Sequence, residues 1–230
     1  MKKRIISTCV ICIMLIGIGI FAKADAEYNY TEAGEMAAIA LELLEDSTDS
    51  NVIYENGQIV ITDAELKKKI LGLQMAGKNA QAFSEEQTIM EQAFKELVTV
   101  KTLVAAAEAA GYTVSDAEYE AYKKDIMDAL AVAENKEEMM EFFDSMGGLE
   151  YYFEVMESTV RDSMVIRKYL DDLMMEYAEE NNKDIYSIDF LNEWNEVEED
   201  MKDSIYNDLH ISSQEIADAV SRVDMEVVNK

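Results

Sequence analysis

Proline is absent from this 230-residue chain, and cysteine, histidine and glycine are scarce. Globular proteins contain about 5% proline, much of it in loops, so its absence favours helices joined by short capped turns over a β-rich domain. The only two cysteines, Cys9 and Cys12, lie in an N-terminal apolar run. If that run is removed, no disulfide can stabilise the remaining chain. A chain of this length can bury a sizeable core without one.

The same scarcity argues against an enzyme. His210 is the only histidine, so imidazole ligands cannot converge on a metal ion. A serine–histidine pair would have to combine His210 with Ser212, which is better explained as a helix cap. The nine glycines include no phosphate-binding loop. Calcium was the best inorganic alternative, but residues 196–200 (EVEED) fall in a predicted helix, where the carboxylates point to different sides. We therefore predict no catalytic residue, no metal site and no cofactor.

The N-terminus has the pattern of a secretion signal. Lys2, Lys3 and Arg4 precede an apolar run at residues 5–21, and small residues at 22–26 suit cleavage after Ala26. The alternative is an uncleaved anchor, because the run is barely long enough to span a bilayer. We expect an extracytoplasmic protein, secreted or associated with the cell envelope, with membrane contact only through an uncleaved signal.

Basic residues are few. The chain has 20 basic and 48 acidic residues, for a net charge of −28, and removal of residues 1–26 leaves 16 basic and 47 acidic. Nucleic acid and anionic lipid bind clustered lysine and arginine, so we predict no nucleic-acid partner. The acid excess keeps a protein soluble, and it also suits attraction to basic client segments.

What is present is a series of helix signals. Asn56-Gly57 between two β-rich segments predicts a hairpin with a type I′ turn. Pairs of a hydroxyl residue and Glu or Gln three positions later predict capped helix starts, at Thr62, Ser84, Ser115 and Ser212. Gly111 is expected to end the longest helix in a left-handed conformation. The predicted helices are 31–46, 62–76, 84–110, 115–135, 136–146, 149–179, 187–209 and 213–223, and the predicted strands are 52–54 and 58–61.

Two motifs carry a family resemblance. The first is Asn56, Gly57, Ile61, Thr62, Asp63 and Glu65, and the second is Ala107, Gly111, Val114, Ser115, Asp116 and Glu118. In this order they resemble the N-terminal domain of SurA/PrsA-type export chaperones, over about residues 52–173. The resemblance implies a mainly α, SurA N-like domain with one short hairpin and additional C-terminal helices. The predicted organisation is a signal at 1–26, the helical domain at 27–180 and a C-terminal helical extension at 181–230.

The resemblance also implies a function. The family binds unfolded or extended polypeptides during export, and the 57 residues after 173 are too few for a parvulin isomerase domain. The expected protein is thus a chaperone or holdase without isomerase activity. The alternative is an adaptor or subunit dedicated to one cell-envelope partner.

The candidate peptide-binding site is a cluster of large flexible and aromatic residues around Gly147-Gly148. Methionine surfaces adapt to varied partners because the thioether chain is unbranched and polarisable. We expect a helix pair joined by this turn to bury only one side of each helix and to leave part of the cluster exposed. Core packing of the same residues was the alternative. The cluster comprises Met139, Met140, Phe142, Phe143, Met146, Tyr151, Tyr152, Phe153 and Met156.

Overall fold

The structure, a computed structural model, describes residues 37–39, 42, 50–57, 59–77, 86–133 and 135–223. The signal segment, most of the helix predicted at 31–46 and the Ser84 cap lie outside these residues. The elements are β1 (Val52–Asn56), β2 (Ile59–Thr62), α3 (Asp63–Gly77), α4 (Glu86–Ala109), α5 (Asp116–Ala131), α6 (Lys136–Ser145), α7 (Leu149–Val155), α8 (Glu157–Glu180), α9 (Ile188–Asp208) and α10 (Ser213–Val220). The predicted fold class, mainly α with one short hairpin and further C-terminal helices, is confirmed.

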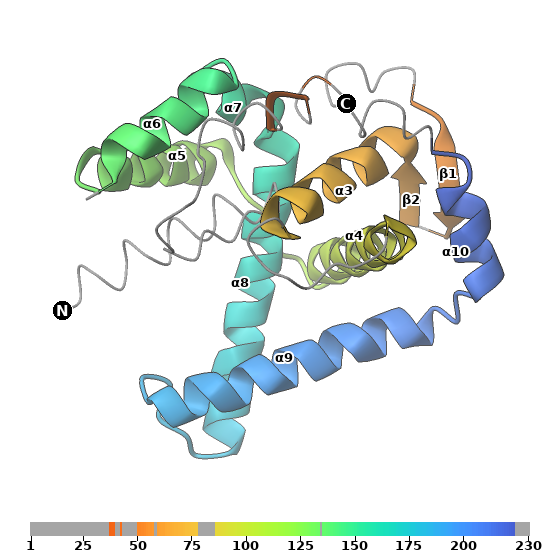
Figure 1. Cartoon of the computed structure of the whole chain (residues 1–230). Helices are drawn as coiled ribbons and strands as arrows, with labels where there is room; N and C mark the ends of the chain where they lie inside the picture. Colours follow the sequence, from red (N-terminus) through yellow and green to blue (C-terminus); the bar gives the residue numbers. More distant parts are fainter. Residues whose placement is uncertain are drawn as a thin grey trace.

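The long helix α8 connects three packed regions (Figure 1). At its N-terminal end, α5, α6 and α7 form a lobe with its own core, which we call the α5–α7 lobe. Near its middle, α8 packs on α4, and α4 packs with α3, the β-hairpin and α10 around a second core. At its C-terminal end, α8 turns back into α9, which runs past α4 towards α10.

The capped helix starts are confirmed wherever the structure describes them. Ser115 Oγ accepts a hydrogen bond from the amide N of Glu118 at 3.3 Å, and the Glu118 carboxylate accepts one from the amide N of Ser115 at 2.8 Å. The same reciprocal pairs form at Thr62 with Glu65 and at Ser212 with Glu215. Each satisfies amide donors that the first helical turn would leave unpaired.

Two local predictions were wrong in detail. Asn56 is the last residue of β1 and pairs with Ile59, so the connection begins at Gly57, with φ +63°, rather than at Asn56. The single helix predicted over 149–179 is divided at Met156, whose backbone (φ −92°, ψ 3°) departs from helical values. This bend lets α7 pack against α6 while α8 leaves the lobe towards α4.

Apolar residues recur every three or four positions in α4 and predict one buried stripe, which the structure shows only in part; the predicted stripe comprises Ile89, Ala93, Leu97, Val100, Val104 and Ala107. Ala93 and Ala107 are buried, but Val100 is exposed, and the larger buried side chains are Phe94, Val98 and Leu103. Because α4 contacts α3, α8, α9, α10 and β2, more than one of its faces is covered. A one-sided periodicity does not predict burial for such a central helix.

The C-terminal helices dock on the rest of the chain. Ala219 and Val223 belong to the same core as the β-hairpin and α4, and an Arg222 guanidinium N donates to the carbonyl O of Ile53 at 3.3 Å. The boundary at 180/181 remains a prediction. The small core at the α8–α9 turn contains residues from both sides of this boundary.

Gly111 ends α4 as predicted and offers a test of the turn. Its φ is +91°, and the amide N of Tyr112 donates to the carbonyl O of Ala107 at 3.0 Å, as in a Schellman motif. A Cβ at this position would meet no atom within 4 Å, so any cost of substitution is backbone strain. We expect Gly111→Val to lower the free energy of unfolding by about 1–2 kcal/mol, measured by urea denaturation. Gly111→Asn is the control and should cost less, since asparagine tolerates this conformation. Equal stability of Gly111→Val and wild type would show that no left-handed residue is needed here.

Candidate functional site

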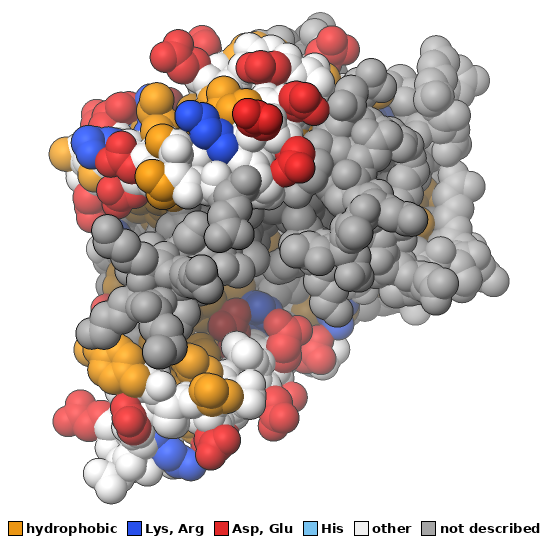
Figure 2. Space-filling view, turned by 60° about the vertical axis from the view of Figure 1, so that its left-hand side comes forward, with side chains coloured by type: hydrophobic (Ala, Val, Ile, Leu, Met, Phe, Trp, Pro, Cys, Tyr) orange, Lys and Arg blue, Asp and Glu red, His pale blue; other side chains and the backbone are white. Residues whose placement is uncertain are grey.

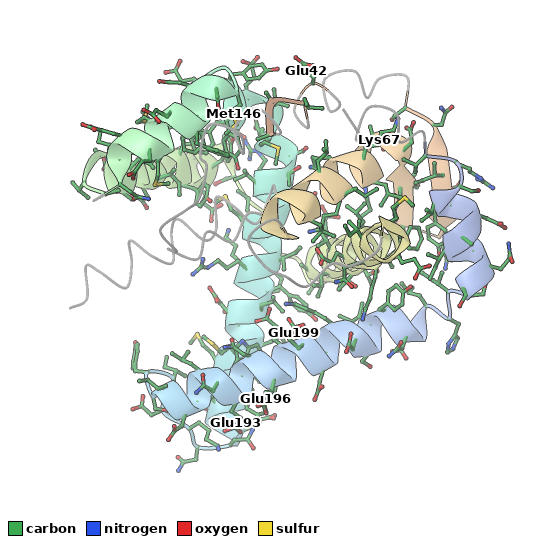
Figure 3. The ribbon with its side chains drawn as sticks, in the orientation of Figure 1. Glu42, Lys67, Met146, Glu193, Glu196 and Glu199 are labelled. Atoms are coloured by element: carbon green, nitrogen blue, oxygen red, sulfur yellow. The ribbon has the colours of Figure 1, made fainter. Side chains whose placement is uncertain are left out.

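None of the nine predicted peptide-binding residues is exposed and seven of them are buried, which corrects the expectation of partial exposure. Met140 and Tyr151 are half-buried. The other seven members are each at most 4% exposed: Met139, Phe142, Phe143, Met146, Tyr152, Phe153 and Met156. Figure 3 labels Met146 within the α5–α7 lobe. The cluster is therefore the core of that lobe.

A chain of ring contacts explains the closure. Phe142, Phe143, Tyr152 and Phe153 meet in successive edge-to-face pairs, with ring centroids 5.3, 5.5 and 5.5 Å apart. Gly147 and Gly148, both with φ +100°, form the turn that brings α6 against α7. A Cβ at Gly147 would lie 2.9 Å from Cδ1 of Tyr151, so this turn also needs the missing side chain. A pair formed by α6 and α7 alone would leave one side of each helix exposed, but α5 also contributes buried residues to the same core.

Polar contacts join the helices of the lobe to one another and to α8. The hydroxyl of Tyr119 donates to the carbonyl O of Phe153 at 2.8 Å in a buried position. Burial is the main reason that the pKa of Tyr119 rises to about 12. The guanidinium of Arg161 lies over the Tyr119 ring, 4.6 Å from its centroid, and pairs with Asp116 and Glu157. These contacts hold the lobe together and against the start of α8.

Exposed apolar side chains occur elsewhere, at the α8–α9 turn. We call residues 171–200, the end of α8 and the start of α9, the arm. Four large hydrophobic side chains on the arm are exposed, and we call them the arm patch: Met175 (56% exposed), Tyr186 (85%), Ile188 (75%) and Leu191 (43%). Figure 2 shows hydrophobic side chains gathered on the lower part of the molecule, where α8 and α9 meet, with acidic side chains around them. Four of the eight large hydrophobic side chains that are exposed among the described residues lie on this one turn, and such a concentration is typical of an interaction surface.

The arm is ordered by its own contacts. Asn182, with φ +51°, ends α8, and the amide N of Lys183 donates to the carbonyl O of Ala178 at 2.8 Å. Ser187 starts α9 by accepting a hydrogen bond from the amide N of Phe190 at 3.1 Å. Beneath the surface, Ala178, Phe190 and Trp194 form a small buried core. The arm patch is thus presented on a preorganised helical turn.

One carboxylate ties the two helices of the arm together. Glu193 accepts a hydrogen bond from the Tyr177 hydroxyl at 2.8 Å and another from Lys183 Nζ at 2.8 Å. The hydrogen bond from Lys183 is the larger cause that holds the pKa of Glu193 below its ordinary value, and the hydrogen bond from Tyr177 acts in the same direction. Figure 3 places Glu193, Glu196 and Glu199 along α9. Of these three, Glu193 has the structural role in the arm.

The arm is far more acidic than the rest of the chain. Residues 171–200 include 12 acidic residues and one basic residue, Lys183. The other 200 residues hold 36 acidic and 19 basic residues. Lys183 is already paired with Glu193, so it adds little positive potential to the surface. The arm patch was not predicted from the sequence, although the charge imbalance around residues 186–191 (YSIDFL) was a usable signal.

The other candidates considered in the sequence, the carboxylates of residues 196–200 and Ser212, form ion pairs and a helix cap. Lys202 pairs with Glu198 at 2.7 Å and with Glu199 at 2.9 Å, which accounts for two carboxylates of the 196–200 run. Ser212 caps α10. Among the described residues, no three His, Cys, Asp or Glu side chains gather as metal ligands would, and no helix there combines the length and apolarity needed to cross a bilayer.

Comparison with known proteins adds no relative: no family model, curated protein or solved structure matches the chain. The SurA/PrsA resemblance accordingly depends on the turn and cap motifs alone.

Proposed function

We propose that this protein is an extracytoplasmic holdase that binds unfolded or extended polypeptides by the arm patch, without catalysing a reaction. The observation that supports the proposal is the exposure of Met175, Tyr186, Ile188 and Leu191 on a turn with its own core. The location outside the cytoplasm follows from the signal pattern at residues 1–26. Relative to the sequence analysis, the binding surface moves from the α5–α7 lobe to the arm.

The physical basis is reversible burial of apolar surface. Each captured side chain contributes on the order of 1–2 kcal/mol by removing apolar area from water. Four such side chains contribute about 4–8 kcal/mol in all, and the cost of association offsets part of this gain, so we expect binding no tighter than about micromolar. Methionine and tyrosine both tolerate varied partners. The acidic surface keeps the complex soluble by repulsion between complexes.

The test is suppression of aggregation, with a matched pair of variants. Wild-type protein should slow light scattering by a denatured test protein, and Ile188→Ser/Leu191→Ser should remove most of this effect. Met127→Ser/Val132→Ser is the control, because Met127 (49% exposed) and Val132 (79% exposed) match the test pair in exposure but lie on α5 and its C-cap. All three proteins should melt within a few degrees of one another.

Full suppression by Ile188→Ser/Leu191→Ser would place client binding away from the arm. No suppression by wild type, even at several-fold molar excess, would contradict the holdase proposal. A panel of unrelated unfolded peptides distinguishes the holdase from the alternative, an adaptor dedicated to one partner. A holdase should bind many of the peptides weakly, whereas an adaptor should bind one peptide and none of the others.

A further inference from the structure

We infer that the arm selects polypeptide segments in which apolar residues alternate with lysine or arginine, and that it binds them by combined apolar and ionic contacts. This inference rests on the proposed function and specifies its client class. It is carried by the coincidence of two independent features on one element, the exposed arm patch and the acidic excess around it.

Charge disfavours two other occupants of an apolar patch, a second copy of this chain and an anionic membrane surface. A second copy of this chain would bring another net charge of −28 and a second set of 12 arm carboxylates against the first. An anionic membrane surface would be repelled in the same way. A basic segment instead meets a field of the opposite sign, which raises its local concentration and its association rate.

Three acidic side chains of the arm have the exposure that such contacts require. Glu176, Glu179 and Glu180 are exposed in the last turns of α8. They are placed at the C-terminal end of a helix, where a negative charge opposes the helix dipole and tends to destabilise. Because these three glutamates do not stabilise the helix, their presence is consistent with a role in binding. For the same reason, replacing these residues by glutamine should not lower the free energy of unfolding.

Trp194 supplies a direct reporter. It is the only tryptophan of the chain, and it lies in the arm core, buried beside Tyr177 with ring centroids 5.9 Å apart. A segment that covers Leu191 and Ile188 on the same helix should alter the emission of Trp194. Binding at the arm is therefore distinguishable from binding elsewhere.

The experiment titrates the full chain with three short peptides of equal length. One alternates leucine with lysine, one alternates leucine with glutamate and one alternates leucine with glutamine. We expect the lysine peptide to shift Trp194 emission and to bind about ten-fold or more tightly than the glutamate peptide at low salt. Its affinity should fall as NaCl is raised towards 0.3 M, because salt screens exposed charges.

Two triple variants locate the ionic contribution. Glu176→Gln/Glu179→Gln/Glu180→Gln should weaken binding of the lysine peptide by about three- to ten-fold. The control, Glu141→Gln/Asp144→Asn/Glu154→Gln, removes the same charge from exposed positions of the α5–α7 lobe and should bind within about two-fold of wild type.

Equal affinities for the three peptides, or equal losses in the two triple variants, would overturn the inference. If the glutamine peptide still binds and shifts Trp194, the holdase proposal survives that result. If no peptide binds and aggregation is not suppressed, both proposals fail together.

Discussion

Replacing Phe143 by alanine is expected to lower the free energy of unfolding by about 3–5 kcal/mol, the usual cost of deleting a buried aromatic side chain. Phe143 is 1% exposed and its ring contacts both Phe142 and Tyr152 edge to face. The loss combines the transfer of the ring to water with the cavity left between α6 and α7. Urea denaturation followed by circular dichroism measures the change. Glu141→Ala, an exposed position on the same helix, should remain within about 0.5 kcal/mol of wild type.

This variant also separates the two possible roles of the aromatic cluster. If the α5–α7 lobe is structural, Phe143→Ala at a temperature where it is still folded should bind peptides as wild type does. A stability change below about 1 kcal/mol together with loss of peptide binding would restore the cluster as the client site. The reason is that a ring which binds clients must be accessible to them, and its removal then leaves no cavity.

Replacing Lys68 by methionine is expected to stabilise the protein by about 1–3 kcal/mol at pH 7. Lys68 is 8% exposed, and its Nζ donates to Thr159 Oγ1 at 3.2 Å. Burial is the main cause that lowers the pKa of Lys68 to about 8, with Glu65 acting in the opposite direction. Methionine keeps much of the volume and removes the buried charge. The cost of leaving Thr159 without this donor is included in the range.

The pH dependence gives this prediction a second readout. Between pH 8 and 10.5, Lys68 is largely neutral in the folded protein but still protonated in the unfolded chain, so the unfolded state binds more protons. Wild-type stability from this group therefore rises with pH in that window. The advantage of Lys68→Met should shrink between pH 7 and pH 9.5. An advantage that grows with pH would show that the Lys68 charge is compensated in the fold.

A neighbouring lysine provides the matched control. Lys69 lies on the same helix but pairs with Glu96, with Nζ and the carboxylate O 2.5 Å apart. Lys69→Met should therefore lower stability, by up to about 1 kcal/mol for a partly exposed pair. Both substitutions replace lysine by methionine. If they change the free energy of unfolding in opposite directions, the cause must be the difference in pairing and burial between the two positions.

The sequence by itself determined the local structure of this protein. The capping boxes at Thr62, Ser115 and Ser212 and the helix end at Gly111 were all predicted, because each depends on hydrogen bonds that close within a few residues. Apart from the division of the helix predicted over 149–179, the described helix boundaries agree within a few residues for the same reason. The hairpin connection was displaced by one residue, since the register of Asn56 with Ile59 depends on the pairing of both strands.

Burial was decided by the tertiary structure. Phe143 and Tyr152 were predicted to belong to a binding surface, but α5, α6 and α7 bury them. Ile188 and Leu191 were not singled out in the sequence, but the structure leaves them exposed on the arm. The composition of a segment shows how much apolar surface it has. Which of that surface meets another helix depends on contacts between residues far apart in the chain.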